Sequence, residues 1–192
     1  MKKVCVLLLV FLFAAAGFAV AGDGEMLRNN EKKAWEKATS VYPAERQLNT
    51  EQFKKLYDRV MAGQEDAYLV DLRTHPEFYA GHIAGTDHIH AGHMYTFPKK
   101  IEKKDAKIVL WCRTKKRGAY VGERLVQLGY TNVWWYKEGI VGWINAGYPL
   151  CNQFMGLFKV TEYHKYFTGE YKEGKKKGQE KDPFRIREFH PY

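Results

Sequence analysis

Short apolar segments alternate with segments of helical spacing between residues 48 and 150, and this alternation constrains the fold most strongly. An apolar run of about four to eight residues is typical of a strand that is buried on both faces of a sheet. Strands that alternate with helices form parallel α/β sheets. The sequence therefore predicts an α/β fold, a parallel sheet flanked by helices on both faces. We expect strands at 68–72, 86–89, 107–111 and 132–136, and helices at 51–61, from 74 onward, at 117–128 and at 140–145.

Two of the expected helices have start signals. Asn49 precedes the first helix and is a residue type that caps helix N-termini. Thr74 and Glu77 have the spacing of a capping box, and Pro76 stands where a missing N–H costs little. We therefore expect the second helix to begin directly after the strand that precedes it.

Cys112 stands between the clearest of these strands and a helix, and a strongly cationic loop follows it. A loop of this length directs backbone N–H groups inward, and the helix N-terminus adds a partial positive charge. Both effects favour a thiolate, the nucleophilic form of cysteine. A buried structural cysteine is the alternative, but burying the neighbouring cations would be costly. The sequence therefore indicates a reactive thiol in a loop that binds an anion; the loop residues are Arg113, Thr114, Lys115, Lys116 and Arg117.

Five segments together resemble a known family over about residues 48 to 150. They are LVDLR at 69–73, EFYAGHIAGT at 77–86, 108–117 with the cysteine loop, 125–130 and 138–149. The family is the single-domain rhodaneses, which are sulfurtransferases. The resemblance implies a rhodanese-like fold in which Cys112 takes up a sulfane sulfur as a persulfide and passes it to a thiophilic acceptor. It also implies that loop residues 113–117 bind the donor, thiosulfate or polysulfide, and that no metal or organic cofactor is needed.

The chain departs from the family pattern at two places. The family commonly has glycine at the fourth loop position, where this chain has Lys115. The lysine adds charge beside the thiol, and the preferred donor is therefore left open. The family often has two glycines where this chain has Glu138 and Gly139, a change that we expect to matter little to the chemistry.

Two other functions compete with sulfur transfer. Cysteine phosphatases on related folds resemble C-x5-R, whereas Arg117 closes a C-x4-R here and the next residue is Gly118, which cannot clamp a phosphoryl oxygen. This spacing argues against a phosphatase. A catalytically silent rhodanese-like module for binding or redox sensing is the remaining alternative, and the presence of Cys112 argues against it.

Asp71 and Arg73 come at the end of an expected strand, on the sheet edge where parallel α/β folds place their sites. Arg73 is therefore a candidate for binding the anion. It could equally pair with Glu77, and we interpret Asp71 as structural.

Five of the seven histidines lie between His75 and His93. His88, His90 and His93 have H-x-H-x-x-H spacing, which is similar to a zinc hydrolase motif. That motif requires an aspartate where this chain has Gly92, and we therefore expect no metal site.

Cys151 is one of three cysteines in the chain, too few for a disulfide scaffold. The helix expected at 140–145 should carry it about 10 Å or more from Cys112 at 1.5 Å per residue. This distance is too long for a disulfide between the two. A buried thiol and an intermolecular disulfide are both left open.

The first residues have the pattern of a signal peptide. Lys2 and Lys3 precede an apolar run at 4–16, and small residues follow at 19–21. We expect cleavage between Ala21 and Gly22, which makes the mature protein periplasmic or secreted. An uncleaved anchor is the alternative, because the apolar run is almost long enough to span a bilayer.

Beyond the signal peptide we expect an arm at 22–47, a rhodanese-like domain at 48–152 and a C-terminal extension at 153–192. The formal charge of +9 favours anionic partners. The lysines at 175–177 stand in a polar segment with no nucleic-acid motif, so we interpret them as solvated. We expect no nucleic-acid partner and no stable membrane insertion after cleavage, and a homodimer is left open.

Overall fold

The computed structural model describes residues 23–160. The chain divides into two compact units, Met1–Val41 and Tyr42–Tyr192. In the first unit, residues 23–40 form one helix. The expected signal peptide at 1–21 and residues 161–192 of the expected extension at 153–192 lie outside the described residues. Among the helices at 23–160, none is both long enough and apolar enough to cross a membrane.

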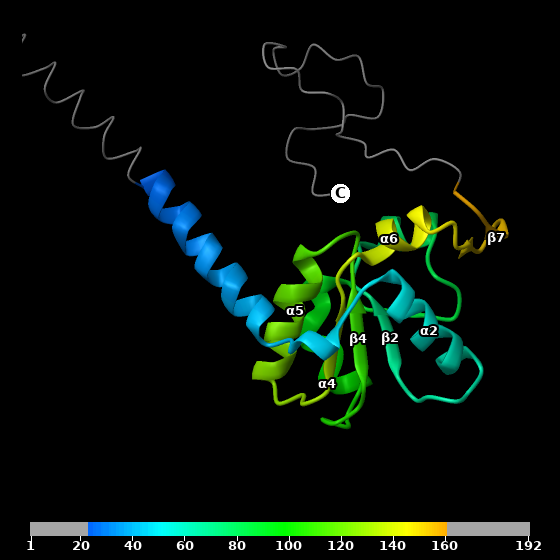
Figure 1. Ribbon diagram of the computed structural model, residues 1–192, viewed down its shortest axis with the longest axis horizontal. Coiled ribbons are helices and arrows are strands. Elements are labelled where there is room, and N and C mark those ends of the chain that lie inside the picture. The colour runs from blue at the N-terminus through cyan, green and yellow to red at the C-terminus, as the bar shows by residue number, and fades with distance from the viewer. Residues whose placement is uncertain (1–22, 161–192) are drawn as a thin grey trace, which may run out of the picture. The chain divides into compact units, whose positions relative to one another are not determined.

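A five-stranded sheet forms the centre of the second unit (Figure 1). Its strands lie in the order β1-β5-β4-β2-β3, and every neighbouring pair is parallel. This arrangement confirms the predicted parallel α/β fold. The strands are β1 (Gln47–Leu48), β2 (Tyr68–Asp71), β3 (Asp87–His88), β4 (Ile108–Trp111) and β5 (Val133–Tyr136).

Helices cover both faces of this sheet, as predicted. Helices α2 and α6 contact each other on one face, and α5 packs on the other against β4, β5 and η2 (Figure 1). The α-helices are α2 (Thr50–Met61), α3 (His75–Ala80), α4 (Phe97–Lys100), α5 (Lys116–Gln127) and α6 (Gly139–Asn145). Two 3-10 helices are η1 (Ala44–Arg46) and η2 (Ala91–Thr96).

Local start signals fix two of these helices at the predicted places. Asn49 and Gln52 form a reciprocal capping box at the start of α2. Thr74 and Glu77 form another at the start of α3, so the helix begins within four residues of the end of β2. The cap matters for the site, because it fixes the carboxylate of Glu77 at the carboxyl edge of the sheet.

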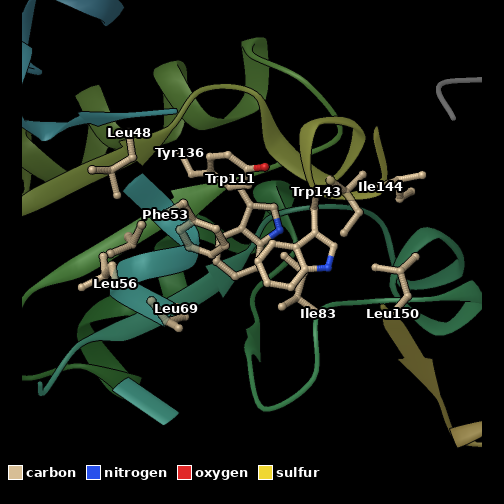
Figure 2. Close-up of a cluster of buried hydrophobic side chains, with 12 residues drawn as sticks. Leu48, Phe53, Leu56, Leu69, Ile83, Trp111, Tyr136, Trp143, Ile144 and Leu150 are labelled. Carbon is tan, nitrogen blue, oxygen red and sulfur yellow. The ribbon is translucent and has the colours of Figure 1, made fainter. Parts of the chain in front are cut away.

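An aromatic cluster fills the space between the sheet and helices α2 and α6 (Figure 2). Phe53 of α2 stacks on Tyr136 of β5 with ring centroids 4.2 Å apart. Its ring also lies 5.2 Å from Trp111 and 5.8 Å from Trp143. The cluster therefore anchors the last residue of β4 directly before Cys112, and it gives the cysteine loop a rigid base.

Several short elements did not follow from the sequence. Strand β1 has two residues, too few to show periodicity, and residues 91–100 form η2 and α4 without an apolar repeat. Past the sheet, β6 (Leu150–Asn152) and β7 (Gly156–Phe158) pair as an antiparallel hairpin. Strand β7 begins at Gly156, whose φ of 63° favours glycine.

Candidate active site

The thiol of Cys112 lies at the base of the loop between β4 and α5. Cys112 is 2% exposed, so the sulfur is protected from bulk water. The loop around it is more open: residues 114–116 are exposed, and Arg113 and Arg117 are partly buried. The structure therefore places a buried thiol at the base of a loop in which Lys115 and Lys116 are exposed.

Helix α6 fixes the backbone of this loop. The N–H of Ile140 donates to the carbonyl of Cys112 at 3.0 Å, and the N–H of Val141 donates to that of Arg113 at 3.2 Å. The C=O and the following N–H of a trans peptide point in opposite directions. The N–H groups of Arg113 and Thr114 therefore point away from α6, which leaves the loop with donors on the side opposite the helix.

Arg117 connects this loop to helix α3. Its Nη1 and Nη2 donate to Oε2 and Oε1 of Glu77 at 2.6 and 2.9 Å, a bidentate pair. Burial opposes the charge of Arg117, but Glu77 and a hydrogen bond to the sulfur of Cys112 outweigh it and raise the pKa of Arg117. Arg117 thus interacts with both the carboxylate of Glu77 and the side chain of Cys112.

Glu77 makes this ion pair sensitive to acid. Burial alone would raise its pKa, but the bonds from Arg117 and the N–H of Thr74 lower the pKa to about 2 from 4.5. The folded pKa is depressed, so the stabilisation is complete above pH 4.5 and is lost as pH falls towards 2. We expect the ionised Glu77 to contribute about 3 kcal/mol to the free energy of unfolding.

Replacing Glu77 by glutamine should therefore lower stability at pH 7 and flatten its decline between pH 4.5 and 2. Denaturant unfolding across this pH range measures both effects. Glu51→Gln is the matched control, because that exposed carboxylate pairs with Lys55 on the same helix. Equal pH profiles of stability for Glu77→Gln and the unmodified chain would show that Glu77 does not cause the loss of stability in acid.

Asp71 and Arg73 form a buried pair beside this site. Nε and Nη2 of Arg73 donate to the carboxylate of Asp71 at 2.7 to 3.0 Å. Nη1 and Nη2 also donate to the carbonyls of Glu77 and Gly81. Arg73 is 6% exposed, and these bonds hold the turn after β2 and both ends of α3. The structure thus gives Arg73 a positioning role for α3, which carries Glu77.

Comparison with known proteins shows which family the chain belongs to. A rhodanese-like domain matches residues 52–146. A sulfurtransferase of Allochromatium vinosum is 32% identical over 92 residues, which are 47% of this chain and 83% of that protein. The chain belongs to the rhodanese family. The uncharacterized protein YibN of Escherichia coli is 30% identical over 95 residues, 47% of this chain and 64% of that protein.

Solved structures share the fold. A protein of unknown function from Rhodopseudomonas palustris, a possible tyrosine phosphatase, superposes with a TM-score of 0.54 at 23% identity, covering 62% of this chain and 92% of its own. The thiosulfate sulfurtransferase of Pseudomonas aeruginosa superposes with a TM-score of 0.52 at 18% identity, covering 67% of this chain and 24% of its own. At these identities the likeness supports the rhodanese fold alone.

Tyr42 is a residue of this rhodanese site that sequence reasoning missed. Its hydroxyl donates to the carbonyl of Gly118 at 2.9 Å, in the first turn of α5. Burial raises the pKa of Tyr42, and the charge of Cys112 raises it further. The hydroxyl therefore stays protonated beside the thiol. Because Tyr42 is 76 residues from Gly118 in the sequence, no local pattern predicts this contact.

The histidines gather near the same sheet edge. The ring of His75 lies 4.8 Å from that of His88 and 5.9 Å from those of His90 and His93. Burial lowers the pKa of His88 and of His90, and nearby positive charges lower that of His90 further. Within the part of the chain that the structure describes, no three His, Cys, Asp or Glu side chains are placed to hold a metal ion.

Proposed function

We propose that the protein is a sulfurtransferase in which Cys112 carries a sulfane sulfur from thiosulfate or polysulfide to a thiophilic acceptor. The observation that carries the proposal is the position of the buried Cys112 thiol, at the base of a cationic loop between strand β4 and helix α5. Membership of the rhodanese family and the sulfurtransferase of Allochromatium vinosum support it. The C-x4-R spacing from Cys112 to Arg117 argues against the phosphatase alternative.

The first step with thiosulfate is a displacement at sulfur. The Cys112 thiolate attacks the outer sulfur, an S–S bond forms to Cys112, and the bond inside thiosulfate breaks to release sulfite. In the second step an acceptor such as cyanide attacks the outer sulfur of the persulfide and regenerates the thiolate. Both steps place negative charge in the loop, where its cations and the N-terminus of α5 stabilise it.

Intact mass of the full chain after exposure to thiosulfate tests the proposal. We expect a gain of one sulfur atom, its assignment to the Cys112 peptide, and its discharge by cyanide. Cys151→Ser is the matched control and should load to the same extent. A folded chain that gains no sulfur from thiosulfate or polysulfide would overturn the proposal and favour a silent binding or redox-sensing module.

Lys115 provides a test of donor recognition. It is exposed at the start of α5, at the position where the family commonly has glycine. An exposed charge contributes about 0.5 to 1 kcal/mol, so we expect Lys115→Gln to raise KM for thiosulfate about two- to fivefold with little change in kcat. Lys115→Gly separates backbone freedom from charge. Unchanged KM values in both variants would exclude Lys115 from donor binding.

We also propose that the protein is exported. Lys2 and Lys3, the apolar run at 4–16 and the small residues at 19–21 support this proposal. Expression in a bacterial host followed by N-terminal sequencing of the mature chain is the test. We expect a chain beginning at Gly22 in the periplasmic fraction, and a full-length chain in the cytoplasm would contradict it.

A further inference from the structure

A second cysteine, outside the Cys112 loop, is paired with a histidine. The Sγ of Cys151 lies 3.3 Å from Nε2 of His82. The other ring nitrogen of His82, Nδ1, lies 3.0 Å from the carbonyl of Phe78. A carbonyl only accepts hydrogen bonds, so Nδ1 carries the proton, and the lone pair of Nε2 faces the thiol. The thiol thus contacts a base, and a carbonyl orients that base, which is the arrangement of activated nucleophiles.

The backbone fixes this pair. His82 and Cys151 form an antiparallel bridge, in which each N–H donates to the other's carbonyl at 3.0 and 2.8 Å. The His82 ring is also stacked on Phe78, with ring centroids 3.8 Å apart. Directly opposite residues of an antiparallel pair place their side chains on the same face. The contact between Sγ and Nε2 therefore follows from the backbone pairing.

Cys151 depends on this base for its reactivity. Burial raises the pKa of the Cys151 thiol, so it keeps its proton at neutral pH. A thiol in that state becomes a nucleophile when a base takes the proton as the new bond forms. This situation contrasts with Cys112, which lies in a cationic loop and interacts with Arg117.

Exposed apolar side chains belong to the hairpin that carries this thiol. Cys151 pairs with Leu157 across the β6–β7 hairpin, and Leu157 is 68% exposed. Phe154 and Met155, between the two strands, are also exposed. A ligand at this thiol would therefore contact the exposed hydrocarbon side chain of Leu157, and the exposed Phe154 and Met155 add apolar surface to the same hairpin.

We propose that Cys151 and His82 form a second thiol site that undergoes exchange with small disulfides carrying apolar or aromatic substituents. The sulfur of Cys151 attacks one sulfur of the disulfide, and a mixed disulfide forms as the original S–S bond breaks. His82 Nε2 takes the thiol proton and returns it to the departing thiolate, so a thiol leaves and the imidazole ends neutral. The site is separate from sulfur transfer at Cys112 and does not rest on it.

The test uses the full chain carrying Cys112→Ser and the probe 4,4′-dithiodipyridine, with modification of the Cys151 peptide followed by mass spectrometry. We expect His82→Gln, which lacks a basic nitrogen, to slow modification of Cys151 at least about tenfold at pH 7. We also expect a change in pH profile. Without the base, the rate should rise about tenfold per pH unit with the thiolate fraction, whereas the His82 chain should show a flatter profile.

Two controls keep the outcome decisive. His82→Asn offers an amide to the carbonyl of Phe78 but lacks the base, and thermal unfolding shows whether either variant is folded. If both variants unfold, the chain that retains His82 is treated with the same probe in its folded state and in denaturant. We expect Cys151 to react at least as fast in the folded chain as in the unfolded one. Equal rates of Cys151 modification with and without His82 would overturn the proposal. So would a slower reaction in the folded chain than in denaturant, if the folded rate also rises tenfold per pH unit.

Discussion

Replacement of Cys112 by serine is expected to abolish sulfur loading and to lower sulfur transfer by at least about a thousandfold. A serine hydroxyl is almost fully protonated at neutral pH, and the hydrogen bond and charge of Arg117 cannot ionise it. The two side chains are similar in size, so the aromatic cluster beneath the loop should stay packed. Steady-state transfer from thiosulfate to cyanide measures the loss.

The stability of Cys112→Ser distinguishes catalysis from folding. Its unfolding midpoint should stay close to that of the unmodified chain, because Cys112 is held by backbone bonds that serine retains. Cys151→Ser should keep full transfer activity. A Cys112→Ser chain that still moves sulfur would show that another group is the nucleophile, and the proposed function would fall with it.

The sequence predicts those parts of the fold and site that depend on neighbouring residues. The capping box of Thr74 and Glu77 lies within four residues, and the position of Cys112 between strand and helix follows from one apolar run. Both are local, so the order of side chains in the chain determines them. The parallel sheet also follows, because alternating strands and helices permit few other arrangements.

The contacts that complete the site join distant residues, and no spacing rule predicts them. Glu77 and Arg117 are 40 residues apart, yet they form the ion pair that positions the end of the cysteine loop. From sequence, Arg117 was expected to bind the donor, whereas the structure also pairs it with Glu77. Arg73 was a candidate for the anion, and the structure pairs it with Asp71. In both cases a carboxylate competes for the guanidinium: topology brings Glu77 to Arg117, whereas Asp71 is two residues from Arg73 in the chain.

Gly139 is another residue whose importance the sequence did not reveal. It precedes the two N–H donors of α6 that hold the cysteine loop, and its φ of 61° lies in the region that favours glycine. A Cβ at this position would overlap the carbonyl of Cys112 and lie 2.8 Å from that of Arg113. The backbones of α6 and the loop thus approach so closely that only glycine fits.

Replacing Gly139 by alanine should therefore separate α6 from the loop. We expect a loss of about 2 to 4 kcal/mol in the free energy of unfolding, from the left-handed backbone and the broken bonds to Cys112 and Arg113. Sulfur transfer should fall at least about tenfold, because the loop donors lose their fixed direction. Denaturant unfolding and transfer from thiosulfate to cyanide measure the two effects.

Gly147→Ala is the control that separates overlap from backbone strain. Gly147 follows α6 with a φ of 74°, but a Cβ there meets no atom within 4 Å. It should cost about 1 kcal/mol of stability and leave sulfur transfer intact. If Gly139→Ala behaved like Gly147→Ala in both measurements, the close contact between α6 and the loop would have no part in holding the thiol site. A larger effect at Gly139 in both would tie the activity of Cys112 to a helix that follows it by 27 residues in the sequence.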